Sequence, residues 1–132
     1  MSMNVLVTGG AGFIGSHTTE ALLEDGARVT VFDNFSTGRR DNLPSHPRLA
    51  VIDADIRDRD AVGQAMTGIT HVLHLAAQVS VRASIDDPPN SCSQNVLGFV
   101  NVLDAARARG VRRVAFASSA AVYGVPARLP GV

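Results

Sequence analysis

A glycine-rich turn near the start of the chain has the spacing of a phosphate-binding loop. It lies between a short β-branched run (residues 4–8) and a segment with helical periodicity, and its glycines are Gly9, Gly12 and Gly15. Such glycines permit a tight turn, close approach of the backbone to a pyrophosphate, and close packing of helix on strand. The helix that follows would direct unpaired N–H groups of Phe13 and Ile14 at the phosphates. Glycine spacing alone also fits an ordinary turn, so the surrounding elements must decide.

An aspartate at the end of the next β-type run supplies a second sign of dinucleotide binding. Asp33 closes the run Arg28 to Asp33. A carboxylate at this point can accept hydrogen bonds from the adenosine ribose hydroxyls and repels a 2′-phosphate. The pair of features predicts NAD rather than NADP, although Arg39 and Arg40 offer cations that could offset the repulsion. A turn-forming aspartate is the alternative interpretation.

The elements that would position these residues alternate between strand and helix. Apolar and β-branched runs predict five strands, over 4–8, 28–33, 49–53, 71–75 and 111–118. Helices are expected over 13–25, with Gly26 as a left-handed cap, from a cap at Asp58 to Gly68, and from Asp87 to Gly110. The stretch 34–47 reads as a loop with one helical turn. This alternation predicts an α/β fold with a doubly wound parallel sheet in strand order 3-2-1-4-5, within one domain over residues 1–132.

The longest predicted helix has two apolar sides. The stripe expected to face the core consists of Cys92, Val96, Val100, Leu103 and Ala106. Phe99 and Val102 lie off this stripe, so we expect a second side that packs on a partner. Cys92 is therefore expected to be a core thiol.

Composition argues against several classes of function. Twelve arginines balance twelve acidic residues with no lysine at all, and neither sign forms a block, so we expect no nucleic-acid or membrane partner. No run is apolar enough to span a bilayer, and no signal peptide is apparent. One cysteine excludes an internal disulfide and a cysteine-rich metal site, which fits a cytoplasmic protein without a bound metal.

Longer motifs carry a resemblance to a known family over essentially the whole chain. They are Thr8-Gly9-Gly10-Ala11-Gly12-Phe13-Ile14-Gly15-Ser16-His17, Asp33-Asn34-Phe35-Ser36-Thr37-Gly38, Asp55-Ile56-Arg57, His74-Leu75-Ala76-Ala77-Gln78, Asn95-Val96-x-Gly98 and Ser118-Ser119-Ala120-Ala121-Val122-Tyr123-Gly124. The chain resembles the extended short-chain dehydrogenase/reductase family, in particular its NAD-dependent nucleotide-sugar epimerases of the UDP-glucose 4-epimerase type. The resemblance implies a Rossmann fold, NAD as cofactor, a UDP-hexose substrate (glucose/galactose or the N-acetylated pair), and a homodimer of the complete protein.

The same resemblance implies roles for individual residues. Those implied to contact NAD are Asp33, Asn34, Ser36, Thr37 and Gly38 at the adenosine ribose and its phosphate, Asp55 and Ile56 at the adenine, Leu75, Ala76 and Ala77 after the fourth strand, and Asn95 near the nicotinamide. For Asn95 a buried amide on the helix surface is the alternative, and His74 reads as a satisfied core histidine rather than a catalytic one.

Substrate contacts are implied for two serines. Ser119 matches the residue that hydrogen-bonds the sugar hydroxyl being oxidised, and Ser84 matches a substrate contact, with a loop or cap serine as its alternative. The family's dehydratases carry acidic residues in the two positions after the serine. Ala120 and Ala121 stand there, so dehydration is disfavoured.

The family's general acid/base, the tyrosine of a Tyr-x-x-x-Lys pair, has no counterpart in the sequence. Tyr123 is the only tyrosine, and Ala127 stands four positions later. We therefore expect the N-terminal part of an epimerase, truncated after the fifth strand and inactive by itself. The alternatives are a non-catalytic NAD-binding module and a fragment of a nucleotide-sugar decarboxylase or reductase; the serine pair Ser118-Ser119 followed by Tyr123 favours an enzyme.

Overall fold

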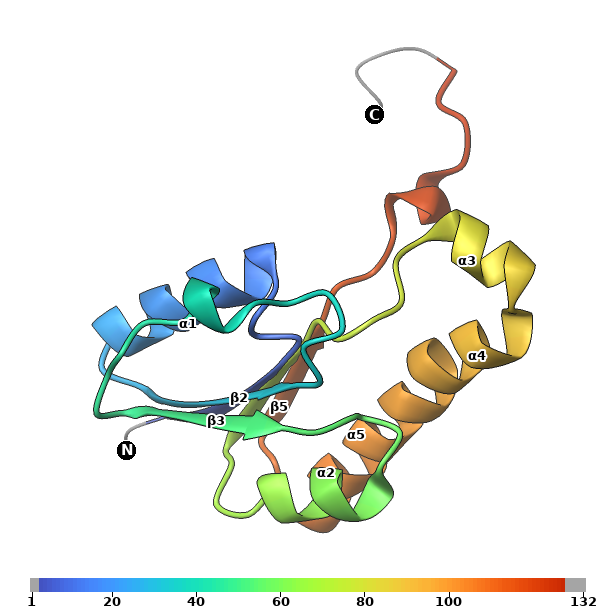
Figure 1. The fold of residues 1–132 in the computed structure, drawn as a ribbon. Coiled ribbons are helices and arrows are strands. Elements are labelled where there is room, and N and C mark those ends of the chain that lie inside the picture. Colours follow the sequence, from blue (N-terminus) through green and yellow to red (C-terminus); the bar gives the residue numbers. More distant parts are fainter. Residues whose placement is uncertain (1–2, 128–132) are drawn as a thin grey trace.

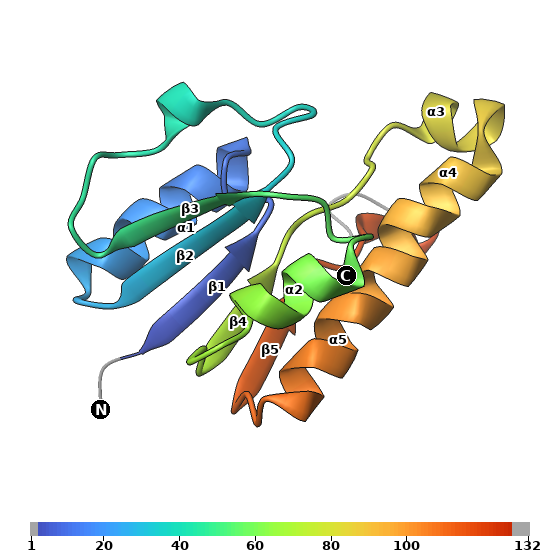
Figure 2. The same ribbon diagram turned by 60° about the horizontal axis from the view of Figure 1, so that its bottom comes forward.

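A parallel five-stranded sheet forms the centre of the molecule in the computed structural model, which describes residues 3–127 (Figures 1 and 2). Its strands are β1 (Asn4–Thr8), β2 (Arg28–Asp33), β3 (Leu49–Asp53), β4 (His71–His74) and β5 (Arg113–Phe116). They lie in the order β3-β2-β1-β4-β5 and all neighbours pair in parallel. The predicted doubly wound topology is confirmed, although β5 is shorter than expected.

Helices cover both faces of the sheet. One face carries α1 (Phe13–Glu24), and the other carries α2 (Arg59–Ala65) and α5 (Gly98–Ala108) (Figure 2). Side chains of β1 alternate between them: Val5 and Val7 pack in the cluster of Leu23, whereas Leu6 packs in the cluster of α2 and α5. Burial on both faces explains the uninterrupted apolar runs in the sequence.

Local signals place most helix ends. Gly26 follows α1 with a φ of +88°, as predicted for a left-handed cap. Asp58 accepts hydrogen bonds from the N–H groups of Asp60 and Ala61 at the start of α2. One 3₁₀ turn (Arg40–Asn42) occupies the predicted loop after β2.

The segment predicted as one long helix has three parts. These are α4 (Pro88–Cys92), a π-helical turn (Ser93–Leu97) and α5, preceded by a short helix, α3 (Val81–Asp86), that the sequence analysis did not anticipate. Asp87 caps α4, and Figure 1 shows the segment running from α3 down beside the sheet.

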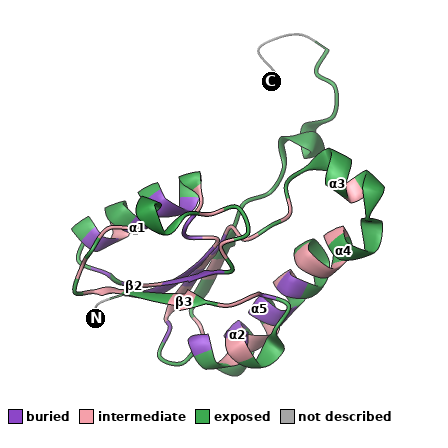
Figure 3. Ribbon diagram, in the orientation of Figure 1, coloured by how far each residue is buried: buried purple, intermediate pink, exposed green. Residues whose placement is uncertain are grey.

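The prediction of which side of this helix faces the core was wrong except at Ala106, which is buried. Val96, Val100 and Leu103 are exposed, and so is Cys92, which is not a core thiol. The buried residues of α5 are Gly98, Asn101, Val102 and Ala106, and Figure 3 shows parts of α5 in the purple of buried residues. Apolar periodicity pointed to the wrong side because the sheet-facing row includes a glycine and an asparagine.

No helix within residues 3–127 is long and apolar enough to cross a membrane.

Candidate nucleotide-binding site

A cleft of about 990 Å³ lies at the carboxyl edge of the sheet, where the loops after all five strands meet. Every residue implied to contact NAD lines it: Gly9, Gly12, Phe13, Ile14, Gly15, Asp33, Asn34, Ser36, Thr37, Gly38, Asp55, Ile56, Leu75, Ala76, Ala77 and Asn95. A cleft of this size at this edge of a parallel sheet is typical of nucleotide sites.

Two of the three glycines in the turn have no room for a side chain, whereas the third has room for a Cβ. Gly9 has a φ of +70°, and a Cβ on it would lie 2.7 Å from the backbone nitrogen of Ala76. A Cβ on Gly15 would overlap the carbonyl oxygen of Gly9. At Gly12 a Cβ would meet only that same oxygen, at 3.4 Å. Packing within the protein therefore requires glycine at 9 and 15 but not at 12, where close approach of a ligand is the remaining physical reason for a glycine.

The N-terminus of α1 directly follows the glycine turn. Gly12 is its N-cap and provides no side-chain cap, and the first N–H to bond back is that of Ser16, to the carbonyl oxygen of Gly12 at 2.9 Å. The N–H groups of Phe13, Ile14 and Gly15 therefore have no intrahelical carbonyl. Together with the helix dipole they can bind an anion, so the residues present fit a pyrophosphate.

Asp33 links the glycine turn to the loop after β2. The residue is 9% exposed, and its carboxylate accepts the N–H of Ala11 at 2.9 Å and that of Phe35 at 2.8 Å. Asn42 donates to the carbonyl oxygen of Ala11 at 2.9 Å. Asp33 thus lines the cleft and joins the glycine turn to the loop after β2. Two lone-pair positions of its carboxylate remain for the hydroxyls of a ligand.

The cation beside this loop is already engaged. Arg40 pairs with Asp53 at 2.8 Å, and its guanidinium lies 4.2 Å from the ring centre of Phe35. Phe35 has a φ of 56°, the only positive value at a non-glycine residue among those described. The ring and the ion pair therefore hold a strained backbone in the loop after β2.

Asp55 carries a strongly stabilised negative charge in the same region. Hydrogen bonds from the Arg57 side chain are the largest cause that holds the pKa of Asp55 well below its usual range, against the opposing effect of partial burial. Asn34 also donates to this carboxylate, at 3.0 Å.

His74 closes the inner end of the cleft as a buried, satisfied histidine, as predicted. Its Nδ1 lies 2.7 Å from Oγ1 of Thr8, and its ring stacks on Phe99 with centroids 4.7 Å apart. Burial lowers the pKa of His74 to about 4, so the ring is neutral at physiological pH.

Asn95 holds the loop after β4 rather than lying buried. The side chain is exposed, its Oδ1 accepts the N–H of Gln78 at 2.7 Å, and its Nδ2 donates to the carbonyl oxygen of Gln78 at 2.9 Å. It lies in the π-helical turn, a wide turn that is frequent at functional sites. The alternative of a buried amide was therefore wrong.

The two serines differ in position. Ser119 lines the cleft, and its Oγ accepts the N–H of Ala121 at 3.1 Å at the start of a 3₁₀ turn (Ala120–Tyr123). Ser84 lies on α3, donates to the carbonyl oxygen of Val81 at 2.6 Å, and is absent from the lining of the cleft. Ser84 is thus neither a loop serine nor a cap, because Ser80 is the N-cap of α3, and its contact with the substrate stays a prediction. Tyr123 is 87% exposed and also lies outside the cleft.

Several lining residues were not anticipated. They are Phe32, Ala54, Gln78, Val79, Gln94, Phe99, Phe116, Ala117 and Ser118. Most of them end or follow a strand, so the carboxyl-edge rule could have found them. Gln94 and Phe99 come from the helical segment, and they were missed because the prediction placed the wrong side of this segment toward the sheet.

A parallel sheet in this order, with a glycine turn at the start of α1 and an acidic residue ending β2, defines a dinucleotide-binding domain of the Rossmann type. The model of the NAD dependent epimerase/dehydratase family matches residues 5–131, and the chain belongs to this family.

Individual relatives are similar along almost all of the chain. The UDP-glucose 4-epimerase of Mycolicibacterium smegmatis is 45% identical over an alignment of 133 positions, gaps included. The alignment covers 97% of this chain and 42% of the relative. The structure of Thermus thermophilus UDP-glucose 4-epimerase in complex with NAD has a TM-score of 0.86 and 44% identity, covering 98% of this chain and 43% of that one. UDP-N-acetylglucosamine 4-epimerase from Methanobrevibacter ruminantium, in complex with UDP-N-acetylmuramic acid, has a TM-score of 0.89 and 37% identity, covering 98% of this chain and 42% of that one. The chain therefore spans about two fifths of the length of these relatives.

Proposed function

We propose that this chain forms the NAD-binding part of a nucleotide-sugar 4-epimerase. The observation that carries the proposal is the single cleft in which the glycine turn, Asp33 and Ser119 come together. UDP-glucose and UDP-galactose are the proposed substrates, with the N-acetylated pair as the alternative, because the similar solved epimerases include enzymes of both kinds.

In this proposal the chain's own residues divide the binding of NAD between them. The N–H groups at the start of α1 hold the pyrophosphate, and the Asp33 carboxylate accepts the adenosine ribose hydroxyls. Ile56 and Asp55 border the adenine, and the small side chains of Ala76 and Ala77 leave room beside the fourth strand. NAD, when bound, supplies a reversible hydride acceptor for oxidation of a sugar hydroxyl.

Ser119 orients that hydroxyl at the other end of the cleft. Its Oγ already accepts one N–H, so its own proton and one lone pair remain for a sugar. A serine of ordinary pKa cannot remove the hydroxyl proton near neutral pH. The epimerase therefore requires a general base in addition to the residues of this chain, and Ala120 and Ala121 disfavour a dehydratase.

A non-catalytic NAD-binding module is the second candidate, because Tyr123 lies outside the cleft. Ser119 in the cleft favours the epimerase, since a module that only binds NAD has no need of a substrate serine. Conversion of UDP-galactose by a longer protein that contains the sequence together with a Tyr-x-x-x-Lys pair, and loss of conversion in its Ser119→Ala variant, would support the epimerase over the module.

Cofactor binding can be tested at Gly12, where a Cβ is compatible with the fold. Gly12→Ala should leave the unfolding temperature nearly unchanged and weaken NAD binding at least about tenfold, because the methyl group occupies the approach path of the pyrophosphate. Gly63→Ala is the matched control: Gly63 lies in α2 with nothing within 4 Å of a Cβ and does not line the cleft. Equal NAD binding by Gly12→Ala and Gly63→Ala in calorimetric titration would contradict this placement of the pyrophosphate.

We also propose that the complete protein pairs as a homodimer through the exposed side of its longest helical segment. Val96, Leu97, Val100 and Leu103 form this apolar surface, which faces away from the sheet. Patches of this kind rarely remain bare in water. Light scattering of the 132-residue chain should show self-association, and Val100→Glu should reduce it. A clean monomer of the unmutated chain at high concentration would count against the proposal. Balanced charge and a single cysteine fit a cytoplasmic enzyme without nucleic-acid or membrane partners.

A further inference from the structure

Ala11 lies between two glycines at the centre of the glycine turn. It is completely buried, and its neighbours in the chain are Gly10 and Gly12. A glycine has no Cβ to restrict its backbone, so the dihedral preferences of these neighbours do not fix the peptide groups on either side of Ala11. Hydrogen bonds to Ala11 must therefore set the conformation of the turn.

The loop after β2 provides these hydrogen bonds. The N–H of Ala11 donates to Oδ2 of Asp33 at 2.9 Å. The carbonyl oxygen of Ala11 accepts from Nδ2 of Asn42 at 2.9 Å and from the backbone N–H of Arg39 at 3.1 Å. Gly38 packs against the same residue, since a Cβ on it would lie 2.9 Å from Cβ of Ala11. The loop therefore holds both backbone polar groups of Ala11, and it holds the carbonyl with two donors.

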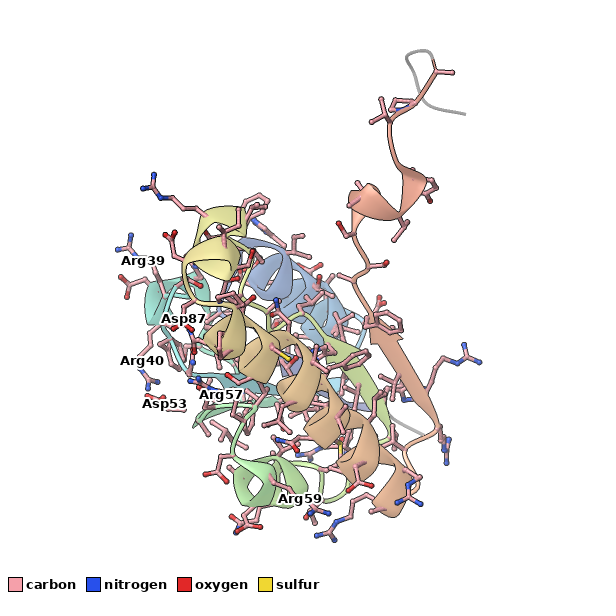
Figure 4. All side chains as sticks on the ribbon, turned by 90° about the vertical axis from the view of Figure 1, so that its right-hand side faces the viewer. Arg39, Arg40, Asp53, Arg57, Arg59 and Asp87 are labelled. Carbon is pink, nitrogen blue, oxygen red and sulfur yellow. The ribbon has the colours of Figure 1, made fainter. Side chains whose placement is uncertain are left out.

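Asn42 makes its bond from outside the cleft, since it is absent from the lining residues. It ends a 3₁₀ turn that is anchored on both sides: Arg40 pairs with Asp53 at 2.8 Å, and Leu43 packs against the apolar cluster on the α1 face of the sheet. Figure 4 shows Arg40 beside Asp53, and Arg39 pointing outward from the loop. The position of Asn42 is therefore set by the fold and not by a ligand.

The carbonyl that Asn42 holds belongs to the peptide group just before α1. In a planar trans peptide the carbonyl oxygen and the N–H point in opposite directions. Here the N–H, that of Gly12, donates to the carbonyl oxygen of Gly9 at 3.2 Å. Rotation of this peptide group would exchange the two directions, so that a carbonyl oxygen would point into the glycine turn. Its partial negative charge would repel a phosphate there.

We propose that Asn42 is a positioning residue for the pyrophosphate: from outside the cleft, its amide holds the Ala11 carbonyl against the loop after β2 and so keeps the start of α1 open to phosphate oxygens. The turn with this peptide group in place is the conformation that binds, and loss of the amide lowers the fraction of molecules that adopt it. This inference rests on the proposed function, since it takes the pyrophosphate of NAD to lie at the start of α1.

Asn4 supplies the matched control. Its Nδ2 also donates to a distant backbone carbonyl oxygen, that of Gly68, at 3.0 Å. Asn4 begins β1, at the opposite edge of the sheet, and does not line the cleft. Asn4→Ala therefore removes an amide-to-carbonyl bond of the same kind at a distance from the glycine turn.

The experiment compares Asn42→Ala, Asn42→Leu and Asn4→Ala with the unmutated 132-residue chain, by calorimetric titration with ADP and with adenosine. The two ligands differ only in the two phosphates, so the ratio of their affinities reports on the phosphate site. Both Asn42 variants should weaken ADP binding about fivefold and leave adenosine binding nearly unchanged. Asn4→Ala should leave the ratio as it is in the unmutated chain.

Three results would count against these assignments. An unchanged ratio in a folded Asn42→Ala variant would overturn the role of Asn42 and leave the nucleotide site intact, and so would equal weakening of both ligands, which a merely structural role would cause. Should Asn42→Ala fail to fold, the same outcomes in Asn42→Leu, which keeps the volume without the donor, would overturn the inference equally. Equal binding of ADP and adenosine by the unmutated chain would overturn the proposed place of the pyrophosphate and this inference with it.

Discussion

Oγ1 of Thr8 and Nδ1 of His74 lie 2.7 Å apart and join the carboxyl ends of β1 and β4. The same hydroxyl oxygen accepts the N–H groups of Leu75 and Ala76, both at 3.2 Å. This arrangement favours donation from the Thr8 hydroxyl to an unprotonated Nδ1 of His74, that is, to the neutral tautomer with its proton on Nε2. The strand ends that border the cleft thus depend on an uncharged His74.

This dependence predicts that stability falls in mild acid. Burial lowers the pKa of His74 from 6.5 to about 4, so the unfolded chain takes up this proton first as the pH falls. The stabilisation is complete above pH 6.5 and should be lost progressively between pH 6.5 and about 4, by up to about 3 kcal/mol. Urea unfolding across this range measures it. His74→Gln should flatten the pH profile, and an unchanged profile in that variant would show that His74 is not the cause.

Asp33 should determine both cofactor affinity and cofactor choice. Asp33→Ala should weaken NAD binding by about 1 to 3 kcal/mol, since it removes a charged acceptor. NADP binding should not improve, because the same change releases the N–H groups of Ala11 and Phe35 and because Arg40 remains paired with Asp53. Titration of both dinucleotides checks this. Equal or tighter binding of NADP by the unmutated protein would contradict the prediction.

Thr19 offers a stabilising substitution. It is fully buried in α1, and among the described residues its Oγ1 has no hydrogen-bond partner. Thr19→Val keeps the shape and removes the unsatisfied hydroxyl, so the free energy of unfolding should rise by about 1 kcal/mol. The neighbouring Thr18 donates to the carbonyl oxygen of Ile14 at 2.8 Å and serves as the control. A thermal melt in which Thr18→Val is stabilised as much as Thr19→Val would refute the explanation.

The 132-residue chain should not interconvert UDP-sugars by itself, even with NAD present. Ser119 lacks the basicity to take the hydroxyl proton, the sequence has no lysine, and Tyr123 lies outside the cleft. An assay of UDP-galactose conversion checks the prediction, with NAD binding measured on the same sample as the control for folding. Activity that disappears in Tyr123→Phe would show that Tyr123 is the base.

The sheet could be predicted because its sequence signals are local. The runs that became β1 and β2 are apolar on both faces, and Gly26 ends the intervening helix through its own backbone preference. Parallel pairing then places every strand's carboxyl end at one edge, which is why the residues of the cleft could be grouped from sequence.

The errors arise where a side chain's role depends on a distant contact. Gly98 and Asn101 face the core because Ile56 and its carbonyl lie against them, and no periodicity of α5 records this. In α3 the apolar residues Val81 and Ile85 are exposed, so the helix has no buried stripe that a pattern could reveal. Asp33 also holds the glycine turn through the N–H of Ala11. The sequence does not indicate this bond, because residues 11 and 33 become neighbours only in the fold.

The strand order also has a consequence for how the chain folds as it is made. β1 lies in the middle of the sheet, and it pairs with β2, which begins at residue 28, and with β4, which begins at residue 71. During synthesis β1, β2 and β3 can assemble with α1 before β4 exists. Throughout that interval one edge of β1 presents unpaired N–H and C=O groups that another chain can bind. The open edge of β1 therefore lasts from completion of β2 to completion of β4, and during that interval the nascent protein can aggregate through it.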